Sequence, residues 1–140
     1  MNLWSSRLVL VAGWFLCSSA LLPEECQPLV TPLSLADPSM MYGRTNFIMG
    51  YTDHPAFNNI LKVTDSSWLT ISQSPANPKE AIMDEMNKIN GKCFSLAINL
   101  TIDGDTATAK FYLPLIINTT SVFNVLPSCD GCLVLSGNTT

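Results

Sequence analysis

The residues with the clearest potential for chemistry are Cys129 and Cys132, which are separated by two residues. A Cys-x-x-Cys motif occurs in thiol oxidoreductases and as one half of many zinc sites. The chain has no second motif of this kind, and its one histidine, His54, is distant in sequence. We therefore expect these two cysteines to serve in structural disulfides, with partners that this motif does not determine, and we expect neither a bound metal nor another cofactor.

The acidic residues do not form a pattern typical of acid–base catalysis. Asp84 and Glu85 are adjacent, so in a β-strand they point to opposite faces and cannot share a proton. Asp103 and Asp105 flank a glycine, which favours a tight turn over a calcium site because few other oxygen ligands lie nearby in sequence. His54 stands beside a proline in an expected loop, and the chain has no Gly-x-Ser-x-Gly motif. We predict that the chain is not an enzyme.

The start of the chain has the pattern of a secretory signal peptide. Arg7 is followed by an apolar run, Leu8–Leu16, and then by small residues that end at Ala20. This run is shorter than the ~20 residues that a membrane-spanning helix needs. We predict cleavage after Ala20, which divides the chain into a signal peptide, 1–20, and one secreted, extracellular domain, 21–140.

The charge of the mature chain argues against nucleic acid as a partner. The chain has eleven acidic and seven basic residues, and Arg7 lies in the predicted leader, so six basic residues remain. Phosphates and anionic membranes repel a mildly acidic protein. The longest remaining apolar run, 111–117, is interrupted by Pro114. We expect no nucleic-acid partner and no membrane span.

Secretion changes the expected roles of the cysteines and of three asparagines. Extracellular proteins commonly contain disulfides, and four mature cysteines allow three pairings. Three Asn-x-Ser/Thr sequons are also present, and each is a potential site of N-glycosylation. The disulfide candidates are Cys26, Cys93, Cys129 and Cys132, and the glycosylation candidates are Asn99, Asn118 and Asn138.

The clearest β-strand is Lys92–Ile102, in which apolar and polar residues alternate. Its apolar set consists of Phe94, Leu96, Ile98 and Leu100. Because a glycan on Asn99 must point outward, this set should point inward and Cys93 outward. Asp103–Asp105 then predicts a hairpin turn, after which Thr106–Leu113 returns as the next strand.

Short turns separate several other strand-like segments. We predict an extended N-terminal arm over 21–38, a loop with a helical turn over 53–62, and strands at Thr45–Tyr51, Ser66–Ser74, Ser121–Leu126 and from Leu133. Lys79–Asn90 is ambiguous, because its apolar residues have helical spacing: Ile82, Met83, Met86 and Ile89. Short strands with tight turns predict an all-β, antiparallel up-and-down meander that forms a barrel or a sandwich.

One stretch, Gly43–Gly50, resembles the Gly-x-Trp signature on the first strand of the lipocalins. The residues that match the longer form of this signature are Gly43, Phe47, Ile48 and Gly50. Thr45 stands where the family has tryptophan, so packing at the closed end of the barrel must differ. The positions of Cys26 and Cys93 resemble those of the apolipoprotein M and alpha-1-acid glycoprotein branch, and Ser128–Gly131 resembles a turn of that branch. The stretches MYGRTNFIMGYTDH, SSWLTISQSP, TIDGDTATA and LPSCDGCLV are most similar to the toxin-binding lipocalins of fish.

The resemblance implies a specific architecture. It implies a strand rather than a helix at Lys79–Asn90, and a barrel of eight strands followed by a helix. Because fewer strands are expected before Thr140, we predict an incomplete lipocalin barrel in a C-terminally truncated chain, with an open sheet edge. In the family, Cys26 and Cys93 have their disulfide partners in the C-terminal part, so here Cys129 would pair with Cys132 by default.

The resemblance also implies a function, that of a carrier for a small hydrophobic or amphiphilic ligand. The toxin-binding relatives suggest a guanidinium compound such as tetrodotoxin or saxitoxin, which needs carboxylates and aromatic faces. Either Asp84 or Glu85 must face inward if their segment is a strand. The expected interior ligand-binding residues are Phe47, Met49, Tyr51, Trp68, Phe94, Leu96 and Ile98. The alternative is a secreted β-domain with a filled core and no ligand, which acts through its surface as an interaction module.

Overall fold

The computed structural model describes residues 23–113 and 116–140, and the predicted signal peptide lies outside them. The described residues divide into two units, one that ends at Thr31 and one that comprises residues 32–140. In the first unit, Pro23–Val30 forms helix α2, so the prediction of an extended arm was wrong here. Pro23 suits the first position of a helix, and Glu24 and Glu25 lie in the first turn, where negative charge is favourable.

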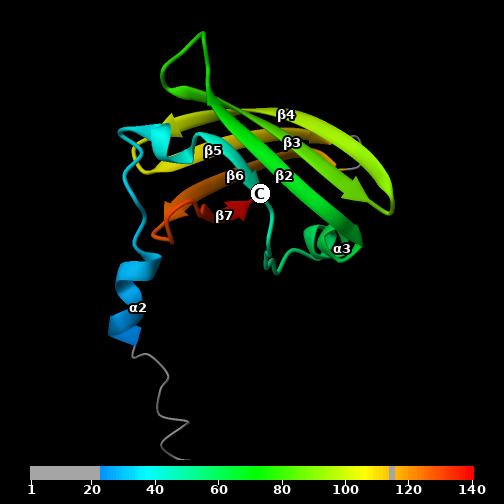
Figure 1. Ribbon diagram of the computed structural model, residues 1–140, viewed down its shortest axis with the longest axis horizontal. Helices are drawn as coiled ribbons and strands as arrows, with labels where there is room; N and C mark the ends of the chain where they lie inside the picture. The colour runs from blue at the N-terminus through cyan, green and yellow to red at the C-terminus, as the bar shows by residue number, and fades with distance from the viewer. Residues whose placement is uncertain (1–22, 114–115) are drawn as a thin grey trace, which may run out of the picture. The chain divides into compact units, whose positions relative to one another are not determined.

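The second unit is built around one antiparallel sheet that curls into a half-barrel (Figure 1). Each strand pairs with the next along the chain, which confirms the predicted all-β, up-and-down meander. The strand order is linear, so β1 and β7 are the two edges of the sheet. The seven strands are β1 (Gly43–Asn46), β2 (Thr64–Gln73), β3 (Glu80–Ile89), β4 (Lys92–Asp103), β5 (Thr106–Leu113), β6 (Ile116–Leu126) and β7 (Val134–Thr139).

The ambiguous segment is strand β3, as the family resemblance implied. It pairs with β2 on one side and with β4 on the other. The helical spacing of its apolar residues is misleading because both faces of the strand carry apolar groups. Met83 is buried on the inner face, whereas Ile82 and Met86 lie on the outer face and are half-buried.

Strand β4 has the orientation that its sequence predicted. Ile98, Leu100 and Ile102 are buried on the inner face, whereas Asn99 and Cys93 are exposed on the outer face. A hairpin turn joins β4 to β5, with Asp103 paired to Thr106 and the Thr106 hydroxyl donating to the Asp103 carbonyl at 2.9 Å.

Strand β1 is shorter than predicted. It ends at Asn46, and the last backbone bond to β2 is donated by the Phe47 N–H to the Ser67 carbonyl at 2.9 Å. The chain then folds back, so that the Phe47 ring approaches Gly50 closely. A Cβ added at Gly50 would lie 2.9 Å from this ring. Residues beyond Asn46 therefore leave the sheet and lead to helix α3, Pro55–Val63.

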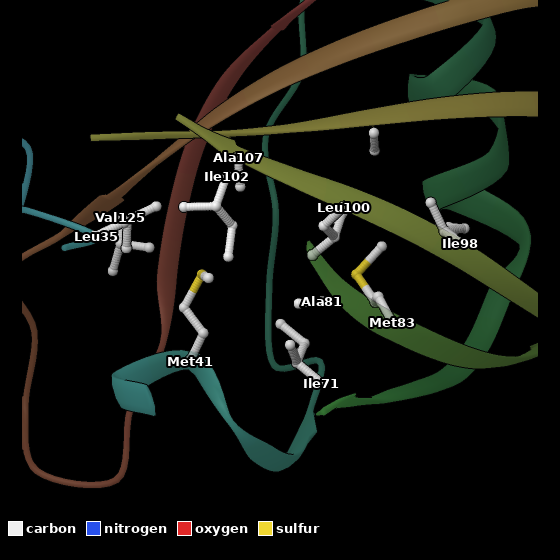
Figure 2. Close-up of a cluster of buried hydrophobic side chains, with 11 residues drawn as sticks. Leu35, Met41, Ile71, Ala81, Met83, Ile98, Leu100, Ile102, Ala107 and Val125 are labelled. Carbon is white, nitrogen blue, oxygen red and sulfur yellow. The ribbon is translucent and has the colours of Figure 1, made fainter. Parts of the chain in front are cut away.

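One end of the inner face is closed by a cluster of buried apolar side chains (Figure 2). The segment before β1 contributes Leu35 and Met41, which are 2% and 3% exposed. It is tied to β6 by the Leu33 N–H, which donates to the Val125 carbonyl at 2.8 Å, and it includes the short helix η1, Pro38–Met41. An apolar void among these side chains holds only about 10 Å³, less than one water molecule needs, so the residues around it are closely packed.

Cys129 and Cys132 form a disulfide with their Cα atoms 5.2 Å apart, which is the pairing that the family resemblance left by default. The bond closes the turn between β6 and β7. Within the turn, the Cys132 N–H donates to the Cys129 carbonyl at 2.9 Å, and the Ser128 hydroxyl donates to the Cys132 carbonyl at 3.0 Å. Cys26 and Cys93 have free thiols.

Candidate ligand-binding face

The strand register places one carboxylate between two leucines on the inner face. Glu85 of β3 pairs with Leu69 of β2 on one side and with Leu96 of β4 on the other. All three residues are half-buried. The next inward pair along the strands, Met83 and Ile98, already belongs to the core. Glu85 thus lies immediately beyond the filled end of the inner face.

The next inward-facing pairs open toward solvent. Asn87 of β3 pairs with Ser67 of β2 and with Phe94 of β4, and Phe94 is 53% exposed. Phe47 bonds to the Ser67 backbone and is 45% exposed. We call this set the inner-face site; it consists of Phe47, Ser67, Leu69, Glu85, Asn87, Phe94 and Leu96.

The inner-face site combines the groups that bind an organic cation. The Glu85 carboxylate can accept hydrogen bonds from a guanidinium or an ammonium group. The exposed ring of Phe94 offers an aromatic face for such a cation on the inner face, and the two leucines supply apolar contact for a carbon skeleton. The neighbouring Asp84 is exposed on the outer face. Of these two acidic residues, Glu85 is the one that faces inward.

The structure brings together some of the residues predicted to bind a ligand, but not all of them. Phe94, Leu96 and Ile98 face inward, as expected, although Ile98 is 3% exposed and belongs to the core. Met49 and Tyr51 are 83% and 93% exposed because the chain has left the sheet. The expectation that they line the interior along a continued first strand is therefore not met.

Trp68 also differs from its expected position. Leu69 and Ile71 face inward, so alternation along β2 places Trp68 on the outer face. There it pairs with Met86, and the Arg44 guanidinium lies 4.3 Å from the centre of its ring. The inward alternation of Leu69 and Ile71 was the sequence signal that should have placed this tryptophan outside.

Two of the three sequons can be located. Asn99 on β4 and Asn138 on β7 are exposed on the outer face, where a glycan has room. The side chain of Asn118 lies outside the described part of the structure.

A second hollow of about 300 Å³ lies between the segment before α3 and the end of β7. Its walls include His54, whose backbone N–H donates to the Thr52 hydroxyl at 3.1 Å and whose ring centre is 5.0 Å from that of Phe57. Sequence reasoning could not find this hollow because the fold alone brings the two segments together. Its lining residues are Thr52, Asp53, His54, Pro55, Gly137, Asn138 and Thr139.

Two further features bear on the class of protein. Within residues 23–113 and 116–140, no three His, Cys, Asp or Glu residues gather in a way that could hold a metal ion. In the same ranges, no helix is both long enough and apolar enough to cross a membrane.

Comparison with known proteins gives no match: no family model fits the chain, and no curated protein or solved structure is significantly similar to it.

Proposed function

We propose that this protein is a secreted carrier that binds a small hydrophobic or amphiphilic molecule on the inner face of its sheet. The observation that carries the proposal is the position of Glu85, half-buried between Leu69 and Leu96 and beside an open, partly aromatic surface. A ligand site typically combines apolar walls with a few polar groups that fix orientation.

The proposal includes a lipocalin-type barrel, because the up-and-down strand order and the Gly43–Gly50 stretch both agree with that family. It also includes a cationic ligand. Tetrodotoxin and saxitoxin are the candidates, because the chain resembles fish saxitoxin- and tetrodotoxin-binding proteins and because a guanidinium group pairs well with a carboxylate.

The proposal is tested by calorimetric titration with tetrodotoxin, with decylguanidinium and with a neutral amphiphile of the same chain length. Glu85→Gln should weaken binding of the two cations by roughly 10- to 100-fold, which corresponds to the loss of one hydrogen bond to a charged group. Affinity for the neutral amphiphile should stay the same. Asp84→Asn is the matched control: it removes the adjacent charge from the outer face and should leave all three affinities unchanged.

If none of the three ligands gives a saturable signal with folded protein, the carrier proposal is wrong. The alternative, an interaction module that acts through its surface, would then be favoured. Two observations already point toward it: the filled core at one end, and three large apolar side chains that are at least 83% exposed, namely Ile48, Met49 and Tyr51.

A further inference from the structure

The hairpin between β3 and β4 contains an asparagine followed by a glycine. These two turn residues, Asn90 and Gly91, lie between the paired residues Ile89 and Lys92. Their φ angles are positive, 49° and 74°, as a type I′ turn requires, and Asn-Gly is the sequence that this turn favours. Both turn residues are exposed. The hairpin therefore presents an Asn-Gly step to solvent.

Asn90 is the only asparagine of the chain that precedes a glycine. Every other asparagine is followed by a larger side chain or by proline, and these groups hinder access to the next backbone nitrogen. Glycine has no side chain, so other groups approach its backbone closely. The Gly91 nitrogen is thus the one that most readily attacks the side chain of the asparagine before it.

The reaction open to this pair is succinimide formation. The Gly91 nitrogen bonds to the side-chain carbonyl carbon of Asn90, the bond from that carbon to the side-chain nitrogen breaks, and the Gly91 proton leaves with that nitrogen as ammonia. Water then opens the five-membered imide at one of its two carbonyls. The product is either aspartate or isoaspartate, and in isoaspartate the backbone runs through the former side chain. A carboxylate replaces a neutral amide, and water is the only co-reactant.

A hydrogen bond from β2 holds the attacking nitrogen. Asp65 lies where the register between β2 and β3 shifts, at a bulge in β2. Its carboxylate accepts a hydrogen bond from the Gly91 N–H at 2.8 Å. The Asn90 N–H donates to the Val63 carbonyl at 3.1 Å. Two hydrogen bonds to residues 63 and 65 therefore fix the turn.

This arrangement opposes ring closure. In the left-handed conformation of Asn90, the Gly91 nitrogen points away from the Asn90 side chain. Closure requires rotation about the Cα–C bond of Asn90, and this rotation carries the Gly91 N–H away from Asp65. The hydrogen bond must therefore break before the nitrogen can attack.

We propose that Asn90 is a site of spontaneous deamidation and that the hydrogen bond from Gly91 to Asp65 controls its rate. The product carries a new carboxylate one residue from the N–H that Asp65 binds, and like charges repel. Isoaspartate also lengthens the backbone of a two-residue turn. Deamidation therefore releases the hairpin from Asp65. This inference does not depend on ligand binding at the inner-face site.

The test measures deamidation of the folded protein during incubation at mildly alkaline pH. Peptide mapping by mass spectrometry quantifies aspartate and isoaspartate at each asparagine, and Asn90 should react before any other. Asp65→Ala removes the acceptor and should speed the reaction at Asn90 roughly three- to tenfold, the range that one exposed hydrogen bond allows. Asp65→Asn keeps an acceptor oxygen for the Gly91 N–H, so its rate should stay within about twofold of the unmodified chain.

A control separates local opening of the turn from a general loss of stability. Ile71→Val weakens the buried core away from the hairpin and should leave the rate at Asn90 unchanged. Circular dichroism checks that each variant is folded, and the same incubation in urea gives the rate of the unfolded chain. The proposal is overturned if Asn90 stays intact in the folded protein while it reacts in urea, if another asparagine reacts first, or if Asp65→Ala reacts no faster than Ile71→Val.

Discussion

Replacing Ile71 by alanine tests whether the closed end of the inner face stabilises the domain. Ile71 is 2% exposed and packs with Met41, Met83 and Leu100 around the small void. Truncating a buried isoleucine to alanine costs about 2–5 kcal/mol. The two methionines are flexible and can partly fill the new space, so we expect about 3 kcal/mol, with about 1 kcal/mol for Ile71→Val.

Urea unfolding followed by circular dichroism measures the free energy of unfolding of each variant. Ser72→Ala, at the exposed outer position next along β2, is the control and should change stability by less than about 0.5 kcal/mol. A loss of about 3 kcal/mol is a large part of the roughly 5–15 kcal/mol that stabilises a typical domain. The reasoning is refuted if Ile71→Ala costs no more than Ser72→Ala, because the cluster in Figure 2 would then not be the core.

Three further predictions concern the ends of elements and the thiols. The N–H of Ser39 donates to the Asp37 carboxylate at 3.0 Å and lowers the pKa of that carboxyl. The ionised Asp37 carboxylate therefore contributes its full stabilisation above its unfolded pKa of about 3.9, and this stabilisation is lost as the pH falls through the lower pKa of the folded state. The free energy of unfolding, measured over this acidic range, should lose that part of its pH dependence in Asp37→Ala. Reducing the Cys129–Cys132 bond should cost no more than about 2 kcal/mol, because the loop that it closes is very short; urea unfolding with and without reductant measures this cost. Cys93 is exposed on the outer face, so Ellman's reagent should modify it in the folded protein nearly as fast as in urea, and strong protection would contradict that placement.

The sequence predicted best those elements in which only one face is apolar. Along Lys92–Ile102 a shift by one residue would bury Asn99 and expose Ile98, so the alternation together with the sequon at Asn99 determined the orientation. The secondary structure of Lys79–Asn90 was harder to predict, because Ile82 and Met86 lie on the outer face. The spacing of its apolar residues was therefore compatible with a helix as well as with a strand. Pairing with two neighbouring strands decides in favour of the strand.

Two predictions were wrong: the length of the first strand and the face of β2 on which Trp68 lies. Residues beyond Asn46 are apolar enough for a strand, but after the single bond from the Phe47 N–H to Ser67 they do not pair with β2 and leave the sheet. Trp68 was predicted among the interior ligand-binding residues, although its neighbours Leu69 and Ile71 occupy the inner face. The inner-face site itself was only partly predictable: a strand at Lys79–Asn90 required one of two acidic residues to face inward, but the leucines opposite Glu85 follow from the register between three strands.

Burial along the inner face explains why a charged group stands where Glu85 does. On β4 the inward-facing residues change from Phe94, 53% exposed, to Ile98, 3% exposed. A carboxylate at the level of Met83, beside Ile98, would lose its water and have no partner, which is costly. One pair further out, at Glu85, the carboxylate is half-buried and keeps part of its hydration. Under the proposed function, a cationic ligand would remove the remaining water and supply the opposite charge in the same step, so full desolvation of the carboxylate would occur only when its partner is present.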